Sequence, residues 1–360
     1  MTAEPSTRPP KQEQEDASVD AVEVAPGVVR TQLPISMPGL GHVNMYVLED
    51  DRGVAVVDPG LPGPDAWVHV VDRLGRAGYQ VADVHTVVVT HSHPDHFGGA
   101  TRLRDEAGAE IVTHESFRTL FDMVELLDQE DSSSLDLNTA EGRDAAMERY
   151  FSTPTPWGGR RPGPPREFVE RLRGTGPAET VFAAPRPTRP LVDGETIRLA
   201  RREWVALHTP GHTADHLCLF DPEHGIVLTG DHVLPSITPH IGGLGDHPDP
   251  LAQFFESLQR MNGLDGVTVA LPAHGHPFTN LAGRADEIVE HHGERLDIIR
   301  DATHGLPDGT VNDFMRVLFR ERSWGEMAES ETYAHLEHLR ELGELTRSAT
   351  GGLATYAPVG

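Results

Sequence analysis

The stretch His85-Thr-Val-Val-Val-Thr-His-Ser-His-Pro-Asp-His96 decides the fold of this chain. Its first half is a β-branched run, which predicts a buried strand. Its second half places three histidines and one aspartate within six residues. Gly98 and Gly99 follow, then a helical pattern over residues 100–106 and a second apolar run over residues 110–113. The order strand, loop, helix, strand puts the histidines at the C-terminal edge of a sheet.

Three later turns repeat this placement of a polar side chain after a strand. The turns are Pro210-Gly-His212-Thr, Thr229-Gly-Asp231-His and Pro272-Ala-His274-Gly. A metal site needs ligands that are far apart in the sequence and meet at one edge of a rigid scaffold. Imidazole and carboxylate ligands suit zinc, and also iron or manganese. The four segments together predict a metal centre.

These motifs, in this order, resemble the metallo-beta-lactamase superfamily, with Asp58-Pro-Gly after an upstream strand. The resemblance covers about residues 25–283 and implies an α/β fold, an αββα sandwich. It also implies two divalent metal ions, with Zn2+ expected first and Mn2+ or Fe2+ as alternatives. The implied ligands are His91, His93 and His212 for one ion, Asp95, His96 and His274 for the other, and Asp231 as the bridge. Asp95 and Asp231 are also the residues to which the resemblance gives a catalytic role, and Asp58 is expected to orient a ligand.

The C-terminal segment predicts a separate small unit. Helical patterns over residues 284–300, 311–320 and 332–345 precede two short strands around Gly351-Gly352, which is typical of a winged helix; a plain helical cap is the alternative. This segment and the run from Thr229 to Pro239 resemble the hydrolase branch near glyoxalase II. Glutamates crowd the third helical pattern and would repel phosphate, so a packing, lid or dimerisation role is preferred and a homodimer is plausible.

We therefore predict three regions. Residues 1–22 form a disordered acidic tail, residues 23–283 form the catalytic domain, and residues 284–360 form the C-terminal domain. A stretch of about residues 117–190, helical at its start and then acidic and rich in Pro, Gly and Arg, is an insertion. Its Arg160, Arg161 and Arg166 would either meet an anionic substrate or form a solvated basic loop.

Charge and composition limit the partners and the chemistry. The chain has 360 residues and a net charge of −26, which makes nucleic acid and anionic membrane surfaces unlikely partners. No run approaches the roughly 18 apolar residues that a membrane span needs, and no secretory signal is apparent. Cys218 is the one cysteine and Lys11 the one lysine, so disulfides and a lysine nucleophile in the folded body are excluded. A cytoplasmic protein with a small-molecule substrate is expected.

The leading functional hypothesis is a binuclear metal-dependent hydrolase. It would cleave a small ester-like carbonyl substrate, a thioester or a lactone, by attack of a metal-bridging hydroxide. A metal-dependent phosphodiesterase or ribonuclease, and a mononuclear iron persulfide dioxygenase, are the alternatives. Of the remaining histidines, His216 and His232 are expected to pack beside the ligands, whereas His240 and His276 lie on loops that could face substrate. Tyr46 and Cys218 are expected in the core.

Overall fold

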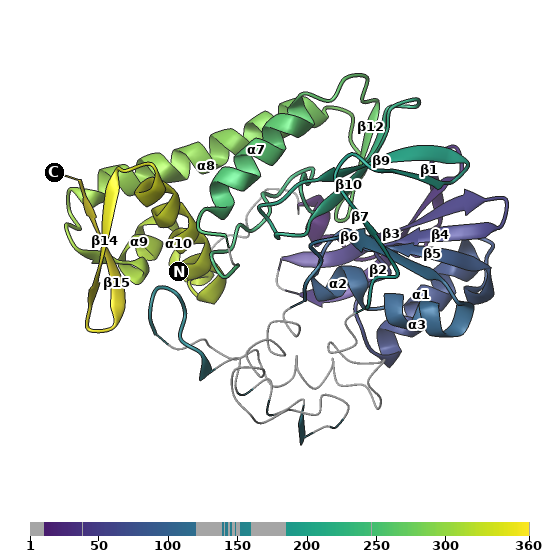
Figure 1. Cartoon of the computed structure of the whole chain (residues 1–360), viewed down its shortest axis with the longest axis horizontal. Helices are drawn as coiled ribbons and strands as arrows, with labels where there is room; N and C mark the ends of the chain where they lie inside the picture. Colours follow the sequence, from purple (N-terminus) through teal and green to yellow (C-terminus); the bar gives the residue numbers. More distant parts are fainter. Residues whose placement is uncertain are drawn as a thin grey trace, which may run out of the picture.

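The computed structural model describes residues 11–119, 152–159 and 185–359, apart from residues 38 and 246, together with five isolated positions between 139 and 148. Two β-sheets pack face to face with helices on their outer sides, and a C-terminal unit lies beside them (Figure 1). This is the predicted α/β sandwich. Residues 117–119, the first of the predicted insertion, are not helical. Most of the rest of it, including the acidic stretch and the arginine cluster, lies outside the described residues.

The first sheet has seven strands in sequence order, antiparallel from β1 to β4 and parallel from β4 to β7. Its strands are β1 (Val22–Ala25), β2 (Val28–Met37), β3 (Leu40–Asp50), β4 (Gly53–Val57), β5 (Val84–Val88), β6 (Glu110–His114) and β7 (Arg189–Leu191). The β-branched run that opens the analysis is β5, and it lies between two parallel neighbours in the buried part of this sheet.

The second sheet has five strands in the order β12-β11-β10-β9-β8. They are β8 (Thr196–Leu199), β9 (Arg202–His208), β10 (Leu217–Asp221), β11 (Ile226–Gly230) and β12 (Val269–Pro272). Strands β8 to β11 pair antiparallel, and β11 pairs with β12 in parallel. The carboxyl ends of β9, β11 and β12 are thereby brought to the same edge.

Side chains point alternately to the two faces of each sheet, which divides the core into layers. Tyr46 and Leu48 of β3 face the second sheet, whereas Met45 and Val47 face the outer helices. Burial of a side chain of this size contributes about 1.5–3 kcal/mol relative to exposure, so a shift of one residue in register would be costly.

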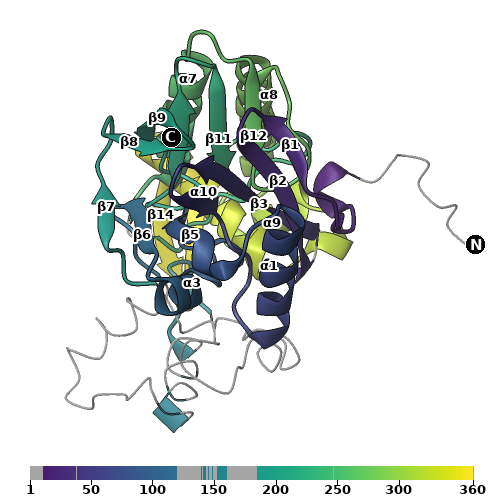
Figure 2. The same cartoon turned by 90° about the vertical axis from the view of Figure 1, so that its right-hand side faces the viewer.

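Helices cover the outer faces of both sheets (Figure 2). On the first sheet they are α1 (Pro64–Arg76), α2 (Pro94–Phe97) and α3 (Ala100–Ala107), with the short 3-10 turn η2 (Val81–Asp83); on the second they are α7 (Pro250–Asn262) and α8 (Leu281–Thr303). Helix α1 buries Trp67, Val70 and Leu74. Val71 is 42% exposed, because it lies at the margin of the apolar stripe.

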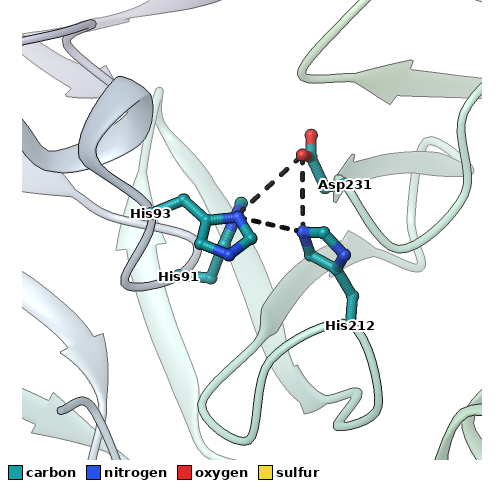
Figure 3. A group of neighbouring side chains, drawn as sticks. All are labelled: His91, His93, His212 and Asp231. Atoms are coloured by element: carbon teal, nitrogen blue, oxygen red, sulfur yellow. Dashed lines mark hydrogen bonds and ion pairs between the residues drawn. The ribbon is translucent and has the colours of Figure 1, made fainter. Parts of the chain in front are cut away.

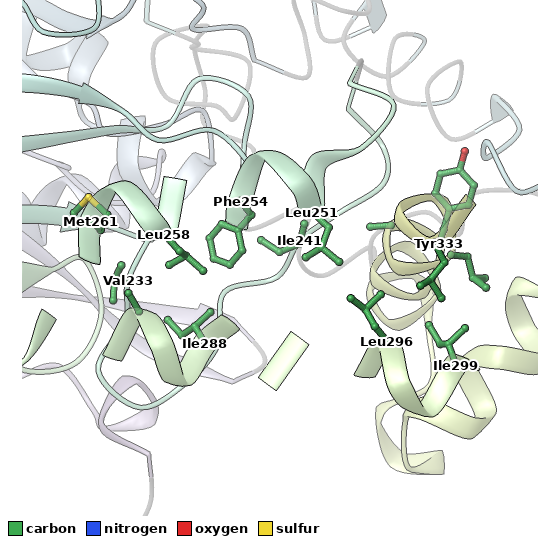
Figure 4. Packing of buried hydrophobic residues seen from close by; sticks show 14 of the residues in the cluster. Val233, Ile241, Leu251, Phe254, Leu258, Met261, Ile288, Leu296, Ile299 and Tyr333 are labelled. Atoms are coloured by element: carbon green, nitrogen blue, oxygen red, sulfur yellow. The ribbon is translucent and has the colours of Figure 1, made fainter. Parts of the chain in front are cut away.

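The C-terminal unit packs against α7 and α8. It contains β13 (Gly309–Thr310), α9 (Val311–Leu318), η4 (Glu321–Ser323), α10 (Glu326–Glu341), β14 (Leu345–Thr350) and β15 (Leu353–Pro358). Figure 4 shows Phe254 and Leu258 of α7 in one apolar cluster with Leu296 of α8 and Tyr333 of α10. The expected boundary at residue 283 falls in the first turn of α8, and the winged-helix assignment stays a prediction.

Helix α10 begins and ends earlier than its predicted range of residues 332–345. Gly343 has φ +76, a left-handed conformation that ends helices. The N–H of Gly343 donates to Arg340 O, and the N–H of Glu344 donates to Leu339 O, which closes the last turn. Leu345 then starts β14.

The N-terminal segment differs from the expected disordered tail over its described part, which starts at residue 11. The 3-10 turn η1 (Gln12–Gln14) lies against the sandwich, and Glu13 is buried. Its carboxylate accepts hydrogen bonds from the backbone N–H groups of Ser236 and Ile237, at 2.7 and 3.0 Å. These long-range bonds hold an acidic residue that composition alone assigns to solvent. Within the described residues, no helix is long and apolar enough to cross a membrane.

Candidate metal centre

Four chain segments bring the seven predicted ligands to one place at the edge of the sandwich. Residues 91–96 run from β5 into α2 and supply four of them. The turns after β9, β11 and β12 supply one each. The seven are His91, His93, Asp95, His96, His212, Asp231 and His274.

The first group consists of His91, His93, His212 and Asp231, whose side chains converge in Figure 3. His93 Nδ1 lies 2.9 Å from His91 Nε2 and 3.1 Å from His212 Nε2. Asp231 Oδ2 lies 3.6 Å from His212 Nε2 and 3.9 Å from His91 Nε2. Two nitrogens on one tetrahedral zinc ion are about 3.4 Å apart, so this spacing fits the ligands of one ion.

The second group consists of Asp95, His96 and His274. Asp95 Oδ2 lies 3.5 Å from His96 Nε2 and 3.6 Å from His274 Nε2. Asp231 reaches this group as well, because its Oδ1 lies 3.2 Å from His274 Nε2 and its Oδ2 lies 3.6 Å from His96 Nε2. One carboxylate therefore stands between the two groups.

Hydrogen bonds on the far side of the rings decide which nitrogen carries the proton. Nδ1–H of His212 donates to the carbonyl of His240 at 2.7 Å, and Nδ1–H of His274 donates to the carbonyl of His42 at 2.6 Å. A carbonyl can only accept, so in the neutral form of both rings Nε2 keeps its lone pair. These lone pairs point toward the other members of the two groups.

Asp58 fixes two further rings in the same way. Its carboxylate accepts from His96 Nδ1–H at 2.9 Å, and from the N–H and the hydroxyl of Thr90 at 2.8 Å each. Since the Thr90 hydroxyl donates to Asp58, it accepts from His91 Nδ1–H at 3.1 Å. Asp58 has φ 54, a left-handed conformation that Asp tolerates better than most residues. The structure thus shows a hydrogen bond between Asp58 and one of the predicted ligands, and its role in orienting a metal ligand stays a prediction.

The centre of the site lacks hydrogen-bond partners that its atoms would need. Within the described parts of the chain, His96 Nε2, His274 Nε2 and Asp231 Oδ1 are buried without one. Buried polar atoms are almost always paired, and lone pairs that face one another repel. Cations would satisfy these atoms together, so the residues fit two divalent metal ions.

Protonation states differ between the two groups. Burial and the neighbouring imidazoles hold the pKa of His91 and of His93 well below the usual value, so both rings are neutral. For His96 and His274 burial acts downward, but the nearby carboxylates of Asp95 and Asp231 prevail and raise the pKa of both rings, so a bound metal ion would replace the positive charge that these carboxylates favour. For Asp231 burial acts upward, but His274 and His96 prevail and hold its pKa well below the usual range. Neutral imidazole and ionised carboxylate are the forms that bind metal.

His216 and His232 lie beside the centre without joining it. His216 Nε2 accepts from the backbone N–H of Asp231 at 3.0 Å, and its Nδ1 lies 2.8 Å from Thr209 Oγ1. His216 therefore positions Asp231 and has no free nitrogen for a metal. His232 is buried with its ring centroid 5.1 Å from that of Phe254. Both placements match the packing role predicted for these residues.

The two loop histidines that were expected to face substrate contact other parts of the protein. His240 Nδ1 lies 3.4 Å from a carboxylate oxygen of Glu331 in α10. His276 lies 2.8 Å from Glu15 and 3.1 Å from Arg30. The ring of His240 is still 25% exposed, which keeps it at the rim of the site.

Sequence reasoning did not find what holds the loop of residues 232–249, which follows Asp231. The anchors come from the N-terminal segment, α8 and α10, and they are Glu13, Arg284, Ser330, Glu331 and His338. Anchor and partner are between 47 and 224 residues apart, so no local pattern marks them. His42, whose carbonyl holds His274, was missed for the same reason.

Cys218 and Tyr46 lie in the core as predicted. Burial raises the pKa of the Cys218 thiol to about 12, so a thiolate nucleophile is not formed near neutral pH. The Tyr46 hydroxyl donates to the carbonyl of Pro272 at 2.7 Å. This bond ties β3 to the strand that ends before His274.

Comparison with known proteins agrees with the fold and the site. The family model of the metallo-beta-lactamase superfamily matches residues 38–274. The "Probable metallo-hydrolase YqjP" of Bacillus subtilis is 24% identical over 286 residues, covering 76% of this chain and 78% of the relative. The crystal structure of the metallo-beta-lactamase family protein TTHA1429 from Thermus thermophilus is 29% identical with a TM-score of 0.71, and the match covers 94% of this chain and 100% of that chain.

A fungal relative is similar over a shorter region. The "Atrochrysone carboxyl ACP thioesterase AgnL7" of Paecilomyces divaricatus is 29% identical over 137 residues. This match covers 36% of the present chain and 41% of the relative, so less than half of either protein is compared.

Proposed function

This chain belongs to the metallo-beta-lactamase superfamily and is a hydrolase, and from that premise we propose that it cleaves a thioester with two divalent metal ions. A lactone is the second ester-like substrate to which the same chemistry applies. Zn2+ is the metal proposed first, with Mn2+ or Fe2+ as alternatives.

The observation that carries the proposal is the orientation of the ligand set. His96, His212 and His274 each donate from Nδ1 to a fixed acceptor, so their Nε2 lone pairs converge on the site. Asp231 spans both groups of residues. Such a set is preorganised, because the rings need not reorient when metal ions bind.

The roles of the residues follow from this arrangement. His91, His93 and His212 would hold one ion, Asp95, His96 and His274 the other, and Asp231 both. When bound, such ions lower the pKa of water toward neutrality and polarise a carbonyl oxygen. Asp58 keeps His96 in the required tautomer, and His216 holds the backbone of Asp231 in place.

One observation favours a thioester as the substrate class. It is the similarity to AgnL7, whose name assigns it a thioesterase activity on an acyl carrier protein. The raised pKa of Cys218 excludes this thiol as an acyl acceptor near neutral pH, whichever ester-like substrate is cleaved. A thiolate with an ordinary pKa of about 8.5 also leaves more readily than an alkoxide.

The test combines metal analysis with a substrate panel. Protein purified without added metal is analysed for metal content and assayed on acyl thioesters of N-acetylcysteamine, on oxygen esters of the same acyl groups and on lactones. We expect about two ions per chain and thioester cleavage that a chelator abolishes and added Zn2+ restores. Asp231→Ala should lose the activity, whereas Asp221→Ala, a buried carboxylate that pairs with Arg202, should keep it.

Other outcomes would assign another reaction to the same residues. Cleavage of a fluorescent RNA with no thioester cleavage would favour the phosphodiesterase. One iron per chain with dioxygen uptake on a persulfide would favour the dioxygenase. Either result would overturn the proposed thioesterase.

A further inference from the structure

The loop of residues 232–249 holds one of the metal-site residues from behind. The carbonyl of His240 accepts the Nδ1–H of His212 at 2.7 Å. Four histidine rings of the site have a hydrogen bond at Nδ1 that fixes their orientation. Besides His212, they are His91 and His96, which are fixed through Asp58, and His274, which is fixed through the carbonyl of His42 in β3. The orientation of His212 therefore depends on a loop, where the other three depend on the first sheet and its strand ends.

The side chain of His240 is held by the C-terminal unit. Its Nδ1 lies 3.4 Å from Oε2 of Glu331 on α10, and Arg295 of α8 forms an ion pair with the other carboxylate oxygen of Glu331. Although burial acts in the opposite direction, His240 and Arg295 lower the pKa of Glu331 to about 2, so the carboxylate is ionised at neutral pH. A buried carboxylate held from two sides has little freedom to move.

The backbone beyond His240 rests on the same turn of α10. The N–H of Gly243 donates to Ser330 Oγ at 3.1 Å. A Cβ atom at Gly243 would lie 2.3 Å from Cδ1 of Tyr333, closer than real contacts allow. Contact this close shows that α10 and residues 240–243 fit together as one packed unit.

We propose that Glu331 is a positioning residue through which the C-terminal helix α10 sets the orientation of His212. The path runs from Arg295 to Glu331, from Glu331 to the ring of His240, and from the carbonyl of His240 to His212. Glu331 is not one of the seven predicted metal ligands. The inference rests on the proposed function, in which His212 is a metal ligand.

The surroundings of Glu331 invite a different reading, a further metal site with His292 and His335. The ligand atoms of these three residues lie within 4.8 Å of one another. However, the Glu331 carboxylate already pairs with Arg295, whose positive charge would repel a cation. His292 and His335 are 3.0 Å apart through Nδ1 and Nε2, a distance that one N–H···N hydrogen bond explains. The positioning role accounts for these contacts without a further ion.

Metal affinity is the direct test, since it does not depend on knowing the substrate. Zn2+ affinity is measured by competition with a chromophoric chelator for the wild type, Glu331→Ala, Glu331→Gln and His240→Ala. We expect Glu331→Ala and His240→Ala each to bind one of the two ions about tenfold more weakly, the low end of the range for partners of ligating histidines. Glu331→Gln should recover most of this loss, because its amide oxygen can still accept from His240.

The control is Glu337→Ala, on the same helix, where the carboxylate is more deeply buried than that of Glu331 and bonds Tyr356 and Arg340 instead. It should lower the stability of the protein and leave Zn2+ affinity unchanged. The double variant Glu331→Ala/His240→Ala should lose no more affinity than either single variant, because both break one path. Should the alanine variant at Glu331 fail to fold, His240→Ala against Glu337→Ala carries the same comparison.

Wild-type affinity in Glu331→Ala or His240→Ala, additive losses in the double variant, or an equal loss in Glu337→Ala would each overturn the inference. A wild-type protein that binds no second ion, or binds metal without hydrolysing any ester, would instead contradict the proposed function. The two failures are distinguishable because one is seen in the variants and the other in the wild type.

Discussion

Two replacements of Asp58, by alanine and by asparagine, should distinguish its contribution to the stability of the protein from its contribution to the geometry of the metal site. Its carboxylate accepts three hydrogen bonds, from the N–H and the hydroxyl of Thr90 and from Nδ1–H of His96. All three donors belong to buried residues. A buried donor left without an acceptor costs about 1–3 kcal/mol. The Thr90 hydroxyl can rotate toward another acceptor, which lowers its part of this cost. A non-Gly, non-Asx residue at φ 54 adds about 1 kcal/mol. Asp58→Ala should therefore lower the free energy of unfolding by about 4 kcal/mol.

Asp58→Asn should affect the metal site more than the stability. Its oxygen can still accept from the N–H of Thr90, and asparagine tolerates the left-handed backbone. Its amide group would then face His96 Nδ1–H, so two donors would oppose each other and His96 would lose its fixed tautomer. We expect a 10–100-fold loss of Zn2+ affinity, the range for partners of ligating histidines, with only about 1–2 kcal/mol of lost stability.

The assays are urea unfolding of the metal-depleted protein and chelator competition of the same samples. Asp221→Asn is the matched control, because Asp221 is also buried and accepts from Arg202 and His224 far from the site. It should lose stability and keep wild-type Zn2+ affinity. If Asp58→Asn bound both ions as tightly as the wild type, the argument that Asp58 orients His96 would be wrong.

Three further predictions use other buried groups. Burial raises the pKa of Asp215 to about 6, so the folded state keeps a proton that the unfolded chain releases near pH 4. The free energy of unfolding therefore falls by up to about 3 kcal/mol as the pH rises from about 4 to about 6, and it stays lower above pH 6. Asp215→Asn should stabilise the metal-depleted protein at pH 7.5 and lose this gain at pH 4.5, and equal effects at both pH values would refute the assignment. Cys218→Ala should keep the kcat/KM of the wild type. Iodoacetamide should not inactivate the folded wild type near neutral pH, and peptide mapping can check that Cys218 is not alkylated. Glu13→Ala should lower the free energy of unfolding by about 2–4 kcal/mol, since two backbone N–H groups lose their acceptor; unchanged urea unfolding would mean that the N-terminal segment is not held as described.

The gathering of the seven predicted ligands could be predicted because each lies directly after a strand. A strand is readable from a short apolar run, and parallel strands bring their carboxyl ends to one edge. Segment 91–96 and the turns at His212, Asp231 and His274 need only this local information. The αββα sandwich and the division of the ligands between two ions came from the resemblance to the superfamily and not from these runs.

The supporting contacts could not be predicted because they join segments without a local signal. Glu13 reads as part of an acidic tail, yet it holds Ser236 and Ile237. Glu331 reads as one of the glutamates that crowd the C-terminal helical segment and would repel phosphate, yet its side chain is only 12% exposed and lies beside His240. In both cases the deciding interaction forms only after the chain has folded, and composition assigns the opposite environment.

The uneven support of the two ligand groups has a mechanical consequence. His274 is held by a carbonyl of β3, and His96 by Asp58 at the end of β4, so their orientation is set by the first sheet. His212 is held by a loop that packs on α10. Loops have fewer internal restraints than sheets, and they open locally at lower free energy. The ion held by His212 should therefore exchange faster than the other, and its exchange should respond to changes in α10. Differential loss of the two ions during dialysis, measured in the wild type and in Glu331→Ala, would show whether the C-terminal unit acts on one ion alone; equal loss rates for both ions in the wild type would contradict this argument.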